Sequence, residues 1–472
     1  MSDSSQSHGG QSQGSISGWR LAAFSILALA IGGVQTPLVL YLPPYYSQQV
    51  GIHLALVGTA FMVSRIWNAV IDPLIGIASD RTRSRIGRRR PYVLGGSALA
   101  LVMTPFVFMP PQGVGPVYLF AVLFVFYLGL SMLSTPLYAW AGDLSSSYHE
   151  RTRIQTYVQT ASSIGAAMIL LIPVLLERFG TSSQSTKVAA MGWFLIAVIV
   201  IGVPALLFST PERARPVPKQ TAGVAEALRL LATDPMVLRV MGSDFFVTLG
   251  QFLRGSVLVF FVSQYMGLGQ SAFFLPFLQY GFGILASPIW ARVGYRFGKS
   301  RTVLIAEGVQ IVICLALLGL APGQLGWLAF LTIAQGLAQG SGNLMLRAIV
   351  TDVADHQRLV TGRERGALLF SIFNVTGYAA MGVAVGVSYP VLGLLFGFVP
   401  GGQNSEAAID GLRWAVAVGP ATGHFLSALL MWRFPLNEAR HAANVRALDA
   451  VQGRPTEDQP GLAAVRAEET RA

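Results

Sequence analysis

Charged side chains are scarce in this chain of 472 residues. Asp, Glu, Lys and Arg together make up 12% of the chain, whereas hydrophobic residues make up 53%. Because the surface of a soluble protein is about a quarter to a third charged, a soluble protein of this length is excluded. The composition instead indicates a chain embedded in a lipid bilayer, which we expect to be one of its partners.

Cysteine and lysine are almost missing as well. The lone cysteine, Cys314, stands in an apolar run, which excludes an intramolecular disulfide and a metal site built on thiolates. The formal net charge is +11, and only three of the 33 basic residues are lysine. No phosphate-binding loop, metal cluster or catalytic triad appears in the sequence. We therefore expect neither an enzyme nor an ATP-driven pump, and no cofactor.

Apolar segments long enough to cross a bilayer follow one another from residue 19 onward. Each is close to the ~20 residues that cross ~30 Å of hydrocarbon. The predicted spans are 19–42, 54–79, 92–110, 115–142, 154–178, 188–209, 237–265, 269–296, 302–321, 325–350, 366–398 and 410–434.

The basic residues are concentrated in alternate loops between these spans. The loop at 80–91 holds six arginines, whereas the loops at 43–53 and 111–114 hold no Lys or Arg. Because cytoplasmic loops carry the excess of positive charge, we expect a multi-pass protein of the cell inner membrane with both termini in the cytoplasm. The positive charge is then a topology signal, and no nucleic-acid partner is expected.

The predicted spans and the polar stretches divide the chain into five regions. The stretch around 223–232 within the linker is expected to form a short surface helix. The regions are a disordered cytoplasmic tail (1–18), a six-helix bundle (19–210), a cytoplasmic linker (211–236), a second six-helix bundle (237–435) and a cytoplasmic tail (436–472).

The two halves of the chain repeat one pattern. The second span ends with Asp72-Pro73 and a basic turn that begins at Asp80-Arg81, and the eighth ends with Ser287-Pro288 and a basic turn around Lys299. Repeats of this kind are typical of secondary transporters, whose site lies at the membrane midplane between the halves.

These motifs resemble those of the glycoside–pentoside–hexuronide:cation symporters, the melibiose-permease-like family of the major facilitator superfamily. The resemblance covers about residues 19–435 and implies an all-α membrane protein with twelve transmembrane helices in two pseudo-symmetric six-helix bundles. We expect a monomer. The matching stretches are 65–76, 79–91, 150–153, 352–356 and 361–363.

A polar helix face in the second span predicts the site of cation coupling. Arg65, Asn68 and Asp72 share this face, and an ionisable side chain inside a membrane indicates function because it is costly to place there. Arg65 would be the charge partner of Asp72. The alternative is a structural Arg–Asp pair that locks this helix against a neighbour.

The resemblance bears on the coupling ion. In the family this face supplies two acidic cation ligands, and the first of them is Asn68 here. A third acidic position is Ser134. Asp72 and Asn68 together with Ser134 or Thr135 could form a weak sodium site, but a lone buried carboxylate exchanges a proton more readily. We therefore expect proton rather than sodium coupling.

The positions that contact the solute are predicted partly from the resemblance and partly from the residues. Where the family has charged or tryptophan side chains, this chain has amide, hydroxyl and aromatic groups, so the predicted site is neutral. Two aromatic candidates stand two positions apart on one helix, so only one of them can face a cavity. The candidates are Gln35, Tyr138, Trp140, Gln159, Gln279, Asn343 and Asn374.

Several other polar residues interrupt the apolar spans. The tyrosines at 41, 45 and 46 predict an aromatic belt at the membrane interface. Asp244 and Glu307 lie near a cytoplasmic helix end, which favours carboxylates that reach water or pair with a loop. His424 is interpreted as a packing residue, with a proton relay as the alternative.

Charged residues at the cytoplasmic helix ends predict a gate. Carboxylates and arginines there could pair across the two bundles when the inner side is closed, and exposed pairs worth ~0–1 kcal/mol each would break in every cycle. The alternative is that these charges only set topology. The gate candidates are Asp80, Arg83, Arg85, Asp143, Arg151, Asp352, Asp355 and Arg363.

The sequence thus predicts a secondary active transporter that carries a sugar, glycoside or uronide together with a cation by alternating access. Its soluble partner would be a small-molecule solute, and the coupling ion a proton or sodium. One alternative is the symport of an amphipathic solute such as a lysolipid or an aromatic acid, because a neutral cavity with aromatic walls suits one. A second alternative is a membrane sensor that transports nothing.

Overall fold

The structure is a computed structural model that describes residues 16–145, 148–180, 183–209, 224–363 and 365–436, together with six residues between 440 and 447. The predicted N-terminal tail and most of the predicted linker and C-terminal tail lie outside these ranges. Every regular element in the described ranges is a helix.

The first bundle begins with a long broken span. Pro37 has no backbone N–H to continue the ladder, and a π-helical turn, η1 (Pro37–Tyr41), joins α1 (Gly18–Thr36) to α2 (Leu42–Gln48). Residues 43–48, predicted as loop, therefore continue this helix. The remaining helices are α3 (Leu54–Arg81), α4 (Arg90–Phe108), α5 (Pro116–Asp143), α6 (Tyr148–Arg178) and α7 (Gln184–Ser209).

The second bundle follows the short helix α8 (Val224–Thr233), which stands where the sequence predicts a surface helix. Asp234 then caps the next helix by accepting hydrogen bonds from the backbone N–H groups of Met236 and Val237. The helices of this bundle are α9 (Pro235–Phe260), α10 (Phe274–Phe297), α11 (Lys299–Ala316), α12 (Leu325–Thr361), α13 (Gly366–Pro390) and α14 (Glu406–Met431). Short turns lie at Phe261–Tyr265 (η2), Gly269–Ser271 (η3), Leu317–Gly319 (η4) and Val391–Leu395 (η5).

A helix occupies each of the twelve predicted spans. By length and composition, ten helices of the described chain could cross a membrane, and an eleventh could if the bent pair at Gly269–Ala286 and Pro288–Phe297 is one span. The twelfth predicted span falls on α12, which has 37 residues. The side chains of 340–343 in α12 are outside the description.

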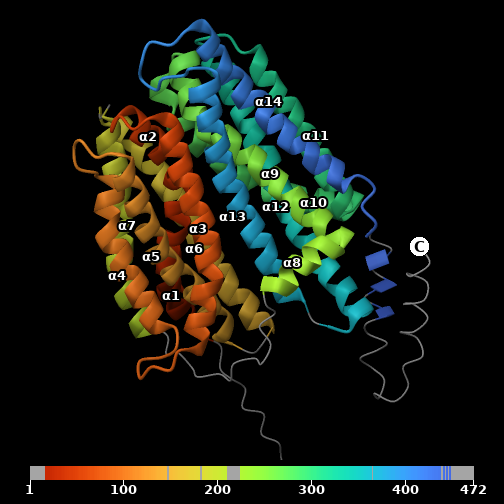
Figure 1. Ribbon diagram of the computed structural model, residues 1–472. Coiled ribbons are helices and arrows are strands. Elements are labelled where there is room, and N and C mark those ends of the chain that lie inside the picture. Colours follow the sequence, from red (N-terminus) through yellow and green to blue (C-terminus); the bar gives the residue numbers. More distant parts are fainter. Residues whose placement is uncertain are drawn as a thin grey trace, which may run out of the picture.

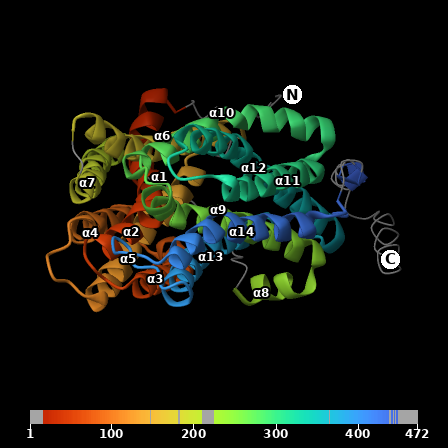
Figure 2. The ribbon, with the colours of Figure 1, turned by 90° about the horizontal axis from the view of Figure 1, so that it is seen from above.

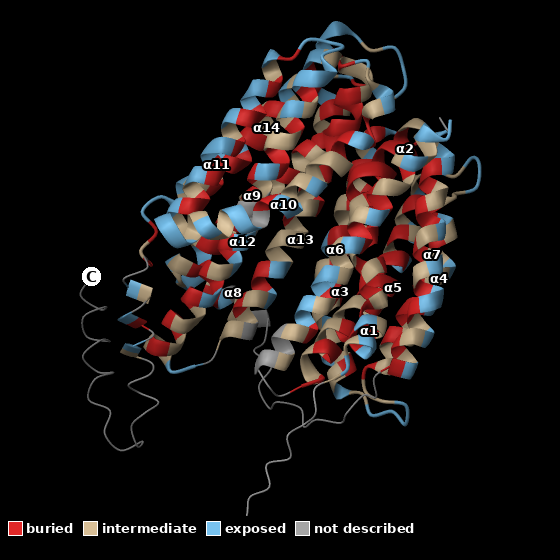
Figure 3. Cartoon of the chain, turned by 180° about the vertical axis from the view of Figure 1, so that it is seen from behind, coloured by how far each residue is buried: buried red, intermediate tan, exposed pale blue. Residues whose placement is uncertain are grey.

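The two bundles lie side by side, with α1 to α7 in one and α9 to α14 in the other (Figures 1 and 2). Between them, α3 packs along α13, η1 contacts α9, and α6 contacts α10. Buried residues lie throughout both bundles, whereas many outward side chains are exposed (Figure 3). Apolar exposed residues such as Phe208, Val117 and Leu395 are compatible with a surface that faces lipid.

Glycines set how closely the helices approach. A Cβ atom on Gly165 of α6 would lie 2.0 Å from the carbonyl oxygen of Leu29 in α1, and one on Gly32 would lie 2.1 Å from that of Ser162. A Cβ on Gly336 of α12 would lie 2.3 Å from the carbonyl oxygen of Gln279 in α10. These contacts are with backbone, which cannot move aside as a side chain can, so only glycine fits there.

This packing predicts that Gly165→Ala destabilises the protein. The added methyl group would overlap the α1 backbone, and overpacking of this kind costs about 1–3 kcal/mol. We expect a lower midpoint of thermal unfolding for the detergent-purified protein. Gly308→Ala in α11 is the matched control, because nothing lies within 4 Å of its added Cβ and alanine favours a helix over glycine. Equal or higher stability of Gly165→Ala would contradict this packing.

Candidate functional site

Asp72 of α3 lies among hydrogen-bond donors at the centre of the first bundle. Its Oδ1 atom accepts a hydrogen bond from Asn68 Nδ2 at 3.0 Å, a short one from Ser131 Oγ and a long one from Thr135 Oγ1 at 3.4 Å. Asn68 Nδ2 also contacts Ser131 Oγ at 2.9 Å. The residues come together because Asn68 and Asp72 lie one turn apart on α3, and Ser131 and Thr135 one turn apart on α5.

The second carboxylate oxygen of Asp72 accepts no bond from this cluster, and the residue lines a cavity of about 120 Å³. Walls come from α1, α3, α5 and α6 of the first bundle, and Tyr378 and Met381 of α13 close the cavity from the second bundle. The carboxylate therefore lies where a relative movement of the two bundles would change its surroundings. We name this space the Asp72 cavity.

The sequence identified Asp72, Asn68 and Thr135 but missed Ser131. Ser134 lines the Asp72 cavity, yet the hydrogen bond to the carboxylate comes from Ser131, one turn earlier on α5. Both serines are candidates by spacing, and the choice depends on how α5 is rotated against α3, which the sequence does not specify.

Arg65 forms no ion pair with Asp72 in the described part of the chain. Its side chain is 2% exposed, and its guanidinium lies 5.1 Å from the centre of the Tyr127 ring. A Cβ on Gly382 of α13 would lie 2.8 Å from the Cβ of Arg65. Arg65 thus lies at the contact between the bundles, where a cation–π interaction stabilises its charge.

A second cavity of about 350 Å³ adjoins the Asp72 cavity, and Gln35 and Met381 line both. We name it the Arg254 cavity, after the arginine of α9 in its wall. Gln279 of α10 lines it and donates a short hydrogen bond to Gln339 of α12. The predicted solute contacts Gln35 and Gln279 therefore lie in one connected region between the bundles.

Of the two aromatic candidates on α5, Tyr138 faces a cavity and Trp140 does not. Tyr138 lines the Asp72 cavity. Trp140 is 1% exposed and packs edge-on against Phe24 of α1 with 5.6 Å between ring centres. The expectation that only one of them faces the cavity is met, and the structure places Trp140 in the core of the bundle, away from the solute.

Gln159 and Asn374 are exposed one turn beyond the Asp72 cavity. Gln159 precedes Ser162 by three residues on α6, and Asn374 precedes Tyr378 by four on α13, so each shares a helix face with a residue that lines the cavity. Polar amides in the middle of membrane-spanning helices favour contact with water over contact with hydrocarbon. The side chain of the other amide candidate, Asn343, is outside the description.

Comparisons with known proteins identify the family. A model of the family described as MFS/sugar transport protein matches residues 23–438. The chain belongs to this family.

Curated relatives of similar length cover nearly the whole chain. The isoprimeverose transporter of Lactiplantibacillus pentosus is 27% identical over 89% of this chain and 89% of its own. The glucuronide carrier protein homolog of Escherichia coli K12 is 24% identical over 87% of this chain and 91% of its own. Among solved structures, a bacterial homolog of the human lysosomal transporter Spinster matches with a TM-score of 0.65 at 13% identity, over 93% of this chain and 99% of its own.

Family and fold identify a multi-pass membrane transporter of the major facilitator superfamily, not an enzyme. The predictions of fold class and of a transport function for a small solute are confirmed.

One end of the transporter is closed by aromatic contacts between the bundles. Tyr41 of η1 stacks on Phe273 of the second bundle with 4.7 Å between ring centres, and the Lys187 ammonium lies 4.8 Å from the centre of the same ring. Lys187 also pairs with Glu177 at 2.6 Å. This cluster lies at the end of the molecule that carries α2 (Figure 1).

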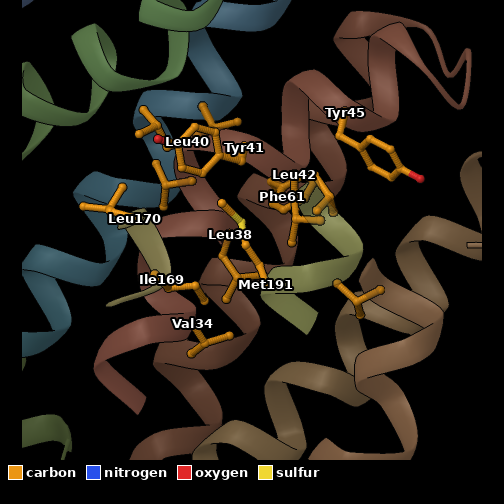
Figure 4. Packing of buried hydrophobic residues seen from close by; sticks show 14 of the residues in the cluster. Val34, Leu38, Leu40, Tyr41, Leu42, Tyr45, Phe61, Ile169, Leu170 and Met191 are labelled. Atoms are coloured by element: carbon orange, nitrogen blue, oxygen red, sulfur yellow. The ribbon is translucent and has the colours of Figure 1, made fainter. Parts of the chain in front are cut away.

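The three tyrosines of the first span are buried, so the predicted interfacial belt is wrong. Tyr41 is 1%, Tyr45 6% and Tyr46 0% exposed, and all three belong to the apolar core. Figure 4 shows Tyr41 and Tyr45 beside other residues of this core. Tyr46 donates a hydrogen bond to the carbonyl oxygen of Val107 at 2.9 Å. The helix continues through η1 into α2, which carries the tyrosines into protein instead of leaving them at the lipid surface.

Glu307 does not reach water, as its position near a helix end suggested. Its Oε2 atom lies 2.6 Å from His424 Nδ1, and the side chains are 2% and 0% exposed. The pair joins α11 to α14 inside the second bundle. Asp244 is 3% exposed, so it does not reach water either.

The gate carboxylates pair within their own bundles. Asp80 pairs with Arg89 at 3.1 Å, and Asp143 pairs with Arg88 at 2.9 Å and with Arg89 at 2.7 Å. These partners differ from the expected Arg83 and Arg85, which are exposed.

The second bundle repeats this arrangement. Lys299, which follows α10 at the start of α11, pairs at 2.7 Å with Asp352 in the last third of α12. Asp355 is half-buried, Arg363 is exposed, and the side chain of Arg151 is outside the description. The repeated motif thus pairs a basic turn with a helix-end carboxylate inside each bundle, and pairing across the bundles in another state stays a prediction.

Proposed function

We propose that this transporter carries a sugar or glycoside together with a cation, and that Asp72 is the coupling group. The proposal rests on the position of the Asp72 carboxylate in a cavity whose walls come from both bundles. When the bundles separate on one side of the membrane, a group in this position can exchange a cation with the solution on that side. When the bundles have moved so that the cavity opens to the other side, it can exchange the cation there.

The presence of a single carboxylate at this site favours a proton over sodium. A sodium ion needs several oxygen ligands, and the hydroxyl oxygens of Ser131 and Thr135 are within reach. Asn68, however, presents its amide N–H group and would have to turn its amide oxygen toward the ion, and Asp72 would be the one acidic ligand. A proton requires no such rearrangement, because a single carboxyl oxygen accepts it.

The size and polarity of the cavities support a sugar as the solute. The Arg254 cavity has about 350 Å³, within the usual range for small-molecule sites. Its amide side chains, Gln35, Gln251, Gln279 and Gln339, suit hydroxyl groups that both donate and accept hydrogen bonds. Most of the rest of the wall is apolar, with Leu40, Phe252 and Ile284 among its residues, so the cavity also has room for the apolar part of an amphipathic solute. The relatives named as an isoprimeverose transporter and a glucuronide carrier homolog also favour a sugar.

The coupling role predicts that Asp72→Asn abolishes uphill uptake. Without a carboxylate the site cannot bind and release a cation in each cycle, so accumulation of labelled solute in proteoliposomes with an imposed pH or sodium gradient should fall to equilibration. Exchange of internal for external solute should persist, because it does not require cation release. Gradient-driven accumulation by Asp72→Asn at the wild-type level would contradict the proposal.

Variants of the neighbouring serines refine this test. Ser131→Ala removes a hydrogen bond to the carboxylate, and such bonds to charged groups contribute about 1.5–3 kcal/mol. We therefore expect it to change the cation concentration for half-maximal uptake by roughly tenfold or more. Ser134→Ala is the matched control in the same cavity, and it should leave that concentration unchanged.

We further propose that the protein lies in a bacterial-type inner membrane with both termini in the cytoplasm and works as a monomer. The arginine-rich turn at 80–91 and the turn at Lys299 lie at the same end of the molecule, opposite α2 (Figure 1). This arrangement satisfies the positive-inside rule. With the α2 end outside, the structure corresponds to a state closed toward the exterior by Tyr41, Phe273 and Lys187.

This orientation is tested with single cysteines in intact cells. The native Cys314 is buried and is replaced by serine to remove background. A cysteine at Arg85 should resist a membrane-impermeant maleimide, whereas one at Gln112, in the opposite loop, should react. The reverse pattern of labelling would contradict the orientation.

A further inference from the structure

Arg254 is a buried cation without an ion pair in the described part of the chain, and the thiol of Cys314 on α11 is the titratable group that interacts with it. The arginine lies in the middle of α9, is 4% exposed and lines the Arg254 cavity. Its Nε atom is buried and has no hydrogen-bond acceptor. Among the described residues, no carboxylate, carbonyl oxygen or aromatic ring contacts its guanidinium.

The buried carboxylates of the described chain form no ion pair with Arg254. Asp244 lies ten residues before it on α9, about 15 Å away along the helix, and Glu307 is held by His424 at 2.6 Å. Asp72 receives the donors of Asn68, Ser131 and Thr135 from its own bundle. A buried charge without a counter-charge strongly lowers the stability of the folded protein. An anion that enters the cavity and pairs with Arg254 would offset this loss of stability.

The rest of the cavity wall fits the other parts of a sugar. Gln35 faces Arg254 from α1 of the opposite bundle, and its buried Oε1 atom also lacks a partner. Gln279 donates a hydrogen bond from Nε2 to Oε1 of Gln339. The Oε1 atom of Gln279 and the Nε2 group of Gln339 can therefore bind hydroxyl groups of a sugar. Among the described residues of the wall, Arg254 is the one cationic side chain, which suits a single negative charge better than a phosphate of nearly two.

We propose that Arg254 binds a carboxylate of the transported solute and thereby makes this protein selective for acidic over neutral sugars. A guanidinium holds a carboxylate through two parallel N–H···O hydrogen bonds. The sugar ring then lies between Gln35 and the paired glutamines, with one end toward the Asp72 cavity. This inference rests on the proposed sugar transport and narrows its substrate class.

Binding of matched acidic and neutral sugars to the full-length purified protein tests the inference. The pairs are 4-nitrophenyl β-D-glucuronide with the glucoside, and D-glucuronate and D-galacturonate with D-glucose and D-galactose. Isothermal titration should give at least tenfold tighter binding of the best acidic sugar than of its neutral partner. Glucose 6-phosphate distinguishes a carboxylate site from a general anion site, and it should bind more weakly than glucuronate.

Variants assign the selectivity to the residue. Arg254→Gln should weaken binding of the acidic sugar by about 10- to 100-fold and leave the neutral one within about twofold, which erases the preference. Arg254→Lys should retain part of the preference for acidic sugars, because lysine keeps the positive charge but lacks the two parallel N–H donors of the guanidinium. Arg292→Gln removes an exposed charge from α10 outside the cavity and should change neither affinity.

Three results would overturn the inference: equal binding of both members of each pair by the wild type, no binding of any acidic sugar at millimolar concentration, or an acidic preference that survives Arg254→Gln. Uphill, Asp72-dependent uptake of a neutral glycoside that is as efficient as that of its acidic partner would refute the carboxylate site while leaving the proposed function intact. Conversely, selective binding without any gradient-driven uptake would refute the proposed function and keep the site.

Discussion

The cost of placing a charge in hydrocarbon governs the interior of this protein. A charged side chain in the middle of a membrane must have a counter-charge, an aromatic face, a set of hydrogen bonds or water. Glu307 has His424, Arg65 has the ring of Tyr127, and Asp72 has three donors on one oxygen. Among the described residues, Arg254 has none of these partners, and it lies in a cavity wall. Asp72 and Arg254 thus both face cavities between the bundles.

Close helix packing keeps these charges in place. The backbones of α1 and α6 meet at Gly32 and Gly165, which leaves no room for side chains between them. Tight packing makes each bundle a rigid body, and the ion pairs Arg89–Asp143 and Lys299–Asp352 tie the helix ends within each. Rocking of the bundles then changes the contacts between them, at Arg65 and Gly382 and at Tyr41 and Phe273, far more than the contacts inside them.

The sequence predicted the helices, the repeat and the carboxylate of Asp72 on a polar helix face, because each depends on local pattern. Hydrophobic length places the spans, and spacing along one helix brings Asn68 to Asp72. Features that depend on how one helix is rotated against another were not predictable. One example is the hydrogen bond to the Asp72 carboxylate, which comes from Ser131 and not from Ser134. Another is Trp140, which packs in the core of the first bundle and does not line the cavity.

Long-range pairing was equally out of reach. The pairs that Asp80 and Asp143 form within the first bundle, with Arg88 and Arg89, were not predicted, because the six arginines of this loop are equally plausible partners until the turn is folded. The burial of Tyr41, Tyr45 and Tyr46 follows from the π-helical turn that continues the first span. An unpaired Arg254 is visible only once every possible partner has been placed.

The central claim is that solute binding and cation binding meet at Asp72. Proton uptake by purified protein in weakly buffered detergent solution, followed with a pH indicator as solute is added, tests it most directly. At a pH where the empty carboxylate is ionised, the wild type should take up protons in proportion to solute bound, and Asp72→Asn should take up none. Equal proton uptake by the two proteins would contradict the account.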